Sequence, residues 1–180
     1  MKKITSTGIL FCLLLFGQTL YSQCNVSSDI ADDGTKIYMH SKEKIYANTD
    51  FENGILAAYA QLVVFQQGDN KDMLKFVLRI DAGRKGSKQM VVPRQIKIYF
   101  TDGLTIELTA ESLESPRMVS GVFMQQSTFR LNSEYYTKLQ SKSLSKVVIS
   151  DNREGTQLIC TPYKDILKEQ SNCIVSKMNL

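Results

Sequence analysis

Residues 95–109, QIKIYFTDGLTIELT, decide the fold class of this chain. Apolar side chains alternate with polar ones on both sides of a central Asp-Gly pair, and a period of two around Asp-Gly is typical of a β-hairpin. A three-residue loop at 101–103 sets Ile98 opposite Ile106 and places all six apolar side chains on one face, whereas a two-residue loop would split them between the two faces. We therefore predict the three-residue loop, with Gly103 in the left-handed position of a β-bulge.

The same alternation predicts further strands. Residues 73–81 carry leucine, phenylalanine and isoleucine on one face and charged side chains on the other, so we expect a sheet with one core face and one wet face. Residues 55–65 are the expected partner, although the helix propensity of 57–62 leaves a helix as the alternative. The other expected strands are an edge hairpin of 36–39 with 44–47, a long strand 118–131 that bends at Gly121, and strands 146–150 and 156–160.

Two helices are expected among these strands. The first opens at Asn132 or Ser133, which are favourable capping residues. The second has Thr161 as its cap and Pro162 at its first position, carries Tyr163, Ile166 and Leu167 on one stripe, and frays near 171–172. Short connections between successive strands favour an antiparallel sheet or β-sandwich with one or two packed helices, including the C-terminal one. The expected fold class is therefore mainly β, a β-rich α+β domain.

Residues 1–22 have the three-part organisation of a cleaved signal peptide. A lysine pair precedes an apolar core at residues 9–16, and small and polar residues follow up to Ser22. The lysines stay at the inner membrane face while the core enters lipid and the peptidase reads the last segment. The core is shorter than the ~20 residues of a spanning helix. We expect cleavage after Ser22, export, and no transmembrane segment after the signal is removed.

The alternative is a lipoprotein that is anchored through an acylated Cys24. A lipobox has a small residue directly before the cysteine, whereas this chain has Gln23 there. A periplasmic or secreted protein without a lipid anchor is therefore the expected form. The signal region, with two lysines, a short core and a Ser-Gln junction, resembles that of exported proteins of Bacteroidota. This resemblance is limited to the signal.

Export leaves three cysteines, Cys24, Cys160 and Cys173, in an oxidising compartment. One disulfide and one remaining thiol is the simplest arrangement. A helix between Cys160 and Cys173 would hold them ~18 Å apart, beyond the ~7 Å that a disulfide tolerates between Cα atoms. The expected pair is Cys24 with Cys173, and three unpaired cysteines are the alternative.

The charge of the exported chain is nearly balanced. The whole sequence has 22 basic and 18 acidic residues, a formal net charge of +4, and loss of the two signal lysines lowers it to +2. Such a balance gives no reason to expect nucleic acid or an anionic membrane as a partner. We expect residues 23–35 to form a loose N-terminal lead and residues 36–180 to form a single β-rich domain.

The sequence contains few residues that suggest catalysis. His40 is the only histidine, which limits catalytic triads and multi-histidine metal sites. Residues 39–44 are typical of a turn, so we expect His40 to be exposed to solvent. No Gly-x-Ser-x-Gly, phosphate-loop or dinucleotide-binding motif occurs. We therefore expect no catalytic residue, no cofactor and no metal.

Two acidic clusters are considered and set aside as metal sites. Asp29, Asp32 and Asp33 precede Gly34, but calcium loops need acids on alternate residues and a distant glutamate. An acidic lead segment is the simpler interpretation. The oxygen-rich segment 69–72 is better explained by turn chemistry.

One basic cluster is the candidate anion-binding site. Arg84, Lys85, Lys88 and Arg94 crowd the connection between two predicted strands. A loop of this kind can bind a phosphate or an acidic glycan, and a merely solvated loop is the alternative.

The first functional hypothesis is an exported, non-catalytic β-rich module that binds a protein or glycan partner at the cell envelope. The alternative is a hydrolase that uses carboxylates on an extracellular or periplasmic polymer, for which Glu107, Glu111 and Glu114 are available acids. A third hypothesis is a small barrel that encloses an apolar ligand.

Overall fold

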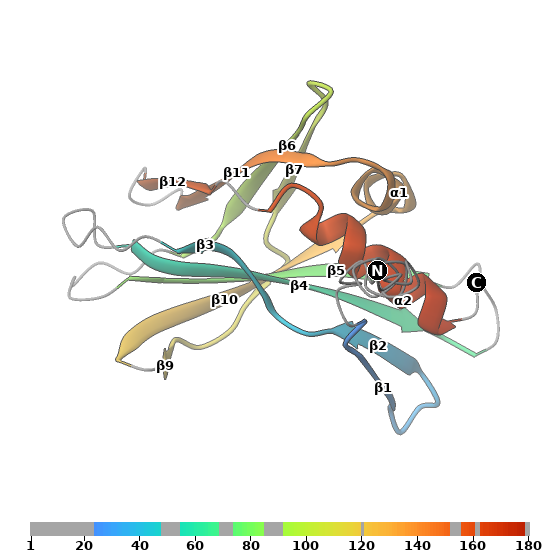
Figure 1. Cartoon of the computed structure of the whole chain (residues 1–180). Coiled ribbons are helices and arrows are strands. Elements are labelled where there is room, and N and C mark those ends of the chain that lie inside the picture. The colour runs from blue at the N-terminus through green and yellow to red at the C-terminus, as the bar shows by residue number, and fades with distance from the viewer. Residues whose placement is uncertain are drawn as a thin grey trace, which may run out of the picture.

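The computed structural model describes residues 24–47, 55–68, 74–84, 92–119, 121–151, 156–160 and 163–178. These residues form two antiparallel sheets and two helices (Figure 1). The larger sheet consists of β1 (Val26–Ile30), β2 (Lys36–His40), β3 (Glu43–Ala47), β4 (Ile55–Gln66), β5 (Leu74–Arg84), β8 (Ser112–Leu113), β9 (Arg117–Val119) and β10 (Val122–Leu131). The smaller sheet consists of β6 (Gln95–Phe100), β7 (Thr105–Thr109), β11 (Leu144–Asp151) and β12 (Thr156–Cys160). The helices are α1 (Ser133–Ser141) and α2 (Ile166–Met178).

The β6–β7 hairpin has the predicted three-residue loop. Ile98 lies opposite Ile106, and the N–H of Phe100 donates to the carbonyl of Leu104 at 2.9 Å. Gly103 has a φ of +86°, a conformation that side-chain-bearing residues rarely adopt. Five of the six aligned apolar side chains are buried, and Leu104, at the tip, is 44% exposed. The predicted register is confirmed, and the fold class with it: the chain is a β-rich α+β protein.

The larger sheet has two interrupted edges, which the sequence analysis did not predict. β2 and β3 both pair with β4, at different points along it, so residues 36–47 follow one edge instead of forming a hairpin. On the other side β8 and β9 both pair with β10. The expected long strand 118–131 is divided near Gly121, which has a φ of +78°: β9 and β10 pair antiparallel on either side of it, with Val119 opposite Val122. β4 is a strand, as preferred over the helix alternative.

One apolar core joins the two sheets and the helices. Leu62, Leu78 and Phe129 of the larger sheet are fully buried in the same cluster as Ile98 of the smaller sheet and Leu167 of α2. Figure 1 shows α2 lying over the β2–β4 part of the larger sheet, on the side that also carries the smaller sheet. α2 therefore completes the core where the smaller sheet does not cover the larger one.

α1 begins as the sequence predicts. Asn132 is its N-cap, and the Oδ1 atom of Asn132 accepts a hydrogen bond from the N–H of Tyr135 at 2.7 Å. Tyr136 and Leu139 are its buried residues, and the Tyr136 ring stacks on Phe76 with 4.0 Å between centroids. This stacking fixes α1 against β5.

α2 begins and ends later than predicted. The expected cap, 161–162, lies outside the described residues, and the helix starts at Ile166, preceded by a turn in which the N–H of Ile166 donates to the carbonyl of Tyr163 at 3.1 Å. Tyr163 is 82% exposed and does not belong to the buried stripe. The helix does not fray at 171–172, because Ser171 is fully buried. None of the described helices is long and apolar enough to cross a membrane.

A disulfide joins the start of the described chain to α2. Cys24 and Cys173 are bonded, with 5.4 Å between their Cα atoms, and they are 149 positions apart in sequence. This is the pair that the sequence analysis prefers. The following residues, expected to be a loose lead, contain β1, which pairs with β2 along its whole length. The disulfide ties this segment to α2, and the strand pairing ties it to β2. Both partners are distant or neighbouring elements, so the polar sequence of the segment alone does not reveal this order.

The prediction of a wet outer face for β5 is wrong. Asp81 lies on that face and is only 4% exposed. Lys42 reaches its Oδ2 atom from one edge of the sheet at 2.5 Å, and Arg117 reaches the same atom from the other edge at 2.9 Å. Lys42 lies in the interruption between β2 and β3, and Arg117 is the first residue of β9, directly after the interruption between β8 and β9. The residues at the two interrupted edges therefore cover Asp81 on this face.

Candidate functional site

The interruption between β2 and β3 forms the candidate site. Met39 pairs with Val63 and Glu43 pairs with Ala60, so three residues of this edge face only two of β4. An extra residue of this kind bends the strand and redirects its side chains. The amide of Gln61 stabilises the bend by donating a hydrogen bond from Nε2 to the carbonyl of His40 at 2.8 Å.

His40 is buried at this bend, which corrects the expectation of a solvent-exposed histidine. It is 3% exposed. Its Nδ1 atom lies 3.0 Å from the carbonyl oxygen of Ser41, and a carbonyl can only accept, so the neutral ring carries its proton on Nδ1. Nε2 then has a free lone pair, and none of the described residues forms a hydrogen bond with it. The turn-like sequence of residues 39–44 does not reveal that α2 covers this histidine.

Gln170 holds α2 over the bend. The Oε1 atom of Gln170 accepts from the N–H of Leu62 at 3.0 Å, and its Nε2 atom donates to the carbonyl of Ala60 at 3.3 Å. The amide thus satisfies β4 backbone groups next to the interruption, where the edge strand leaves them without strand partners. Gln170 is 1% exposed. Its two hydrogen bonds to the β4 backbone therefore fix the distance between α2 and this strand.

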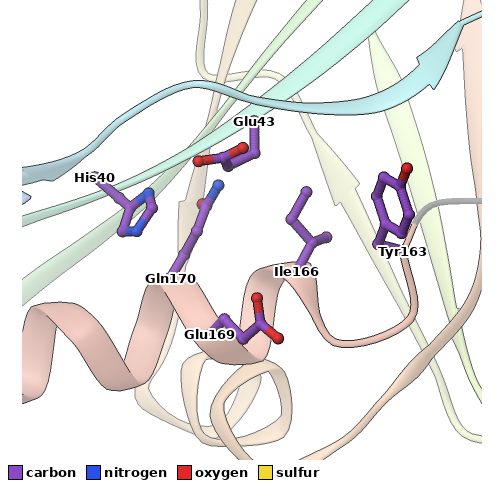
Figure 2. A pocket seen from close by; sticks show the side chains of 6 residues that line it. All are labelled: His40, Glu43, Tyr163, Ile166, Glu169 and Gln170. Carbon is purple, nitrogen blue, oxygen red and sulfur yellow. The ribbon is translucent and has the colours of Figure 1, made fainter. Parts of the chain in front are cut away.

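A small pocket remains between the bend and the helix (Figure 2). Its volume is about 120 Å³, and it is partly open to solvent. Figure 2 shows Glu43 entering from β3 and Glu169, Gln170 and Ile166 entering from α2, with Tyr163 at one side. The lining residues are His40, Glu43, Tyr163, Ile166, Glu169 and Gln170. We call this hollow the His40 pocket.

The His40 pocket is acidic. The Oε1 atom of Glu43 accepts a hydrogen bond from the Ser41 hydroxyl at 3.0 Å. Within the described part of the chain, neither Glu43 nor Glu169 forms an ion pair. Lys42, the neighbour of Glu43 in sequence, is turned to the opposite face of the sheet, where it binds Asp81. The two carboxylates therefore share the pocket without an internal counter-ion.

The described residues include no group of three histidine, cysteine, aspartate or glutamate side chains that could hold a metal ion. This finding covers the His40 pocket and also the Asp29–Asp33 segment. Asp33 instead caps the β1–β2 turn: its Oδ1 atom accepts from the N–H of Thr35 at 2.9 Å. The hydrogen bonds of Thr35, its backbone N–H first, hold the pKa of Asp33 below the ordinary value. The segment 69–72 lies outside the described residues.

The candidate anion-binding cluster is only partly described. The backbone of Arg84 ends β5 and pairs with Phe123 of β10, while Lys85 and Lys88 lie outside the described residues. Arg94 stands just before β6, where its backbone bonds to Ser150 and Ala110. Arg94 thus belongs to the smaller sheet and Arg84 to the larger one.

The acids considered for hydrolysis are exposed and do not line the His40 pocket. Glu107 pairs with Lys97 on the smaller sheet, Glu114 lies 3.6 Å from Arg117 beside the larger sheet, and Glu111 lies on the link between β7 and β8. Two of the three are therefore engaged with cations of the surface.

A second hollow lies on the outer face of the smaller sheet. Its volume is about 410 Å³. Tyr99 is one of its lining residues, with the Lys146 Nζ atom 4.4 Å and the Lys97 Nζ atom 5.6 Å from the ring centroid. The two ammonium groups occupy the ring face that a stacked ligand would need. This hollow is therefore a weaker candidate than the His40 pocket.

No protein-family model matches the chain, and the searches of curated proteins and of solved structures also return no match. The site therefore rests on its geometry. The sequence contains one signal that points to it, the unique histidine, but the residues that complete the pocket lie in α2, more than 120 residues further on.

Proposed function

We propose that this protein is exported and acts at the cell envelope, or outside it, as a non-catalytic binding module. The N-terminal sequence supports export, and so does the Cys24–Cys173 disulfide, since such bonds persist in oxidising compartments. A sulfur atom in this disulfide cannot also carry a lipid, which argues for a protein without a lipid anchor. The expected location is the periplasm or the medium.

One observation carries the binding function: the buried imidazole of His40 faces an open pocket that two glutamates also line. Burying a polar atom without a partner is costly, and the Nε2 atom of His40 has no hydrogen-bond partner among the described residues, so an external partner that completes it is favoured. The partner is a protein or a glycan of the envelope. Nucleic acid is not expected, because the charge is nearly balanced.

A hydrolase acting on an extracellular or periplasmic polymer is the second candidate. Glu43 and Glu169 favour it, since two carboxylates in one pocket are the minimal set for glycosidic cleavage. The pocket of about 120 Å³ is small beside the roughly 300–1,000 Å³ of ordinary ligand clefts. This difference in size favours binding over cleavage.

Intact-mass analysis of the protein recovered from the periplasm and the medium tests export. We expect Gln23 as the first residue and a mass lower by two hydrogens for one disulfide. An acyl group on Cys24, or retention of residues 1–22 in a cytosolic product, would contradict the proposal.

Co-sedimentation with purified cell envelopes then separates the two candidate functions. A binding module sediments with the envelope and releases no sugar. A hydrolase produces reducing ends that increase with time. The Glu169→Gln variant should weaken sedimentation, while Glu111→Gln, an exposed glutamate outside the pocket, should leave it unchanged. Failure of the wild-type protein to sediment would contradict the binding proposal.

A further inference from the structure

We propose that the His40 pocket binds a primary ammonium group carried on a short aliphatic chain. This inference rests on the proposed binding function and names the ligand chemistry of the same site. It depends on the hydrogen-bond character of the lining groups, on their charge and on the shape of the pocket.

Three of the side chains that line the pocket, those of His40, Glu43 and Glu169, offer acceptors. With the proton of the neutral His40 ring on Nδ1, its Nε2 atom is an acceptor. Ionised Glu43 and Glu169 have only acceptor oxygens, and a single oxygen of Glu43 is engaged by Ser41. A primary ammonium group has three N–H donors and no acceptor. One such group therefore matches an imidazole nitrogen and two carboxylates.

The charge of the pocket selects a cation. Two carboxylates share it, and the nearby Lys42 is held on the other face of the sheet by Asp81. A bound cation forms charge-assisted hydrogen bonds with the carboxylates, and such bonds are about twice as strong as neutral ones.

A metal ion is the weaker alternative for this pocket. His40, Glu43 and Glu169 line it, yet among the described residues no group of three such side chains is placed to hold a metal. The N–H donors of an ammonium group can reach separate acceptors, each at about 2.7–2.9 Å.

The remaining lining accommodates an aliphatic stem. Ile166 supplies an apolar wall, and the Tyr163 ring, 82% exposed, stands at one side of the pocket in Figure 2. An aromatic ring near a cation adds attraction through its face. A volume of about 120 Å³ equals on the order of four water molecules. The pocket thus fits an ammonium group with a few methylenes and excludes a sugar ring or a bulky quaternary amine.

A lysine side chain of a partner protein carries its ammonium group on a flexible aliphatic stem and therefore fits this pocket. An amino sugar of a glycan carries the ammonium group directly on a ring, which the pocket excludes. Small model compounds of the two kinds distinguish these cases.

The unique histidine allows a direct test by NMR. Long-range ¹H–¹⁵N spectra of the mature protein report the two ring nitrogens of His40 without assignment of any other histidine. At about pH 8 an alkylamine is protonated. Titration with n-butylammonium chloride at constant ionic strength should shift the Nε2 resonance saturably, with a Kd on the order of 1–10 mM for so small a ligand.

Two variants and one compound serve as controls. Glu169→Gln should weaken binding about tenfold, while Glu111→Gln should bind as the wild type does. Tetramethylammonium chloride has the charge but no N–H donor and should cause no saturable shift. Nα-acetyl-lysine amide should bind saturably and glucosamine should not; saturable binding of glucosamine alone would overturn the assignment of a short aliphatic stem.

The proposal is overturned if n-butylammonium gives only a linear shift, if tetramethylammonium acts equally, or if Glu169→Gln binds unchanged. If these results occur while the wild-type protein still sediments with envelopes, the binding function stands and only the ammonium assignment fails. If both experiments are negative, the proposed function fails as well.

Discussion

The outer faces of the two sheets differ although both come from strands that alternate in the same way. On the smaller sheet, Lys97, Tyr99 and Glu107 face solvent around an open hollow. On the larger sheet, Asp81 is buried under Lys42 and Arg117. The difference shows that the alternation of apolar and polar residues identifies the face of a strand that joins the core. Whether the other face is exposed or buried depends on residues supplied by the edge strands.

Removing both cations from Asp81 should have the largest effect. The double variant Lys42→Met, Arg117→Met leaves a buried carboxylate uncompensated, and such changes cost about 3–5 kcal/mol. Each single variant should cost less, because the other cation remains. Urea denaturation with an unchanged m-value measures the loss. A double variant no less stable than Lys97→Met, its counterpart on the smaller sheet, would show that the outer face of β5 is open.

Gly83→Ala tests the packing of the same outer face further along β5. A Cβ atom at position 83 would collide with the Met124 sulfur, lie 2.8 Å from the Val122 Cγ1 atom and lie 3.0 Å from the Phe123 carbonyl oxygen. Overpacking of this kind costs about 1–3 kcal/mol. The loss should be smaller in a Met124→Ala background, which a double-mutant cycle detects. Strict additivity of the two changes would contradict the contact.

Alkali should distinguish a buried group from an exposed one. Burial raises the pKa of Tyr136 above its ordinary value of 10.0, and the Tyr136 hydroxyl donates a hydrogen bond to the Ser171 carbonyl only while it is protonated. The unfolded chain ionises this tyrosine first, so stability falls as pH rises from about 10 through the folded-state pKa. Tyr136→Phe should reduce this alkaline loss and cost about 0.5–1.5 kcal/mol at neutral pH.

The control for this measurement is Glu107→Gln on the smaller sheet. The hydrogen bond from Lys97 to Glu107 raises the pKa of Lys97 above 10.5. Its stabilising contribution is therefore present below pH 10.5 and is lost as pH rises through the folded-state pKa. Because the pair is exposed, we expect the alkaline unfolding profile to match the wild type. If Glu107→Gln changed the alkaline unfolding profile more than Tyr136→Phe does, the Lys97–Glu107 pair would matter more for stability than the buried Tyr136, which contradicts this interpretation.

The smallest effect is expected for Glu107→Ala at neutral pH. Exposed ion pairs are screened by solvent and often contribute nothing measurable. The denaturation midpoint should stay within experimental error, in contrast to the Lys42 and Arg117 double variant. A clear loss of stability would mean that the smaller sheet also relies on outer-face charges.

The sequence predicted the β6–β7 register, the strand character of β4 and the start of α1, because each depends on neighbouring residues. It did not predict the course of residues 36–47 along β4, because an interrupted strand and a hairpin have similar local patterns. It predicted an exposed His40 for the same reason: the turn-like residues 39–44 are local, while Gln170 and Glu169, which build the pocket, belong to a distant helix.

The amino-acid sequence by itself determined the alternating strands, the inward faces and the β-rich class, since hydrophobic periodicity and turn residues act over a few positions. Only the tertiary structure decided which polar residues are buried and which meet in a pocket. Asp81 receives its cations from residues 39 and 36 positions away, and His40 meets Glu169 only because α2 packs across β2 and β4. Burial and charge pairing depend on distances in space, and the folded chain alone sets those distances.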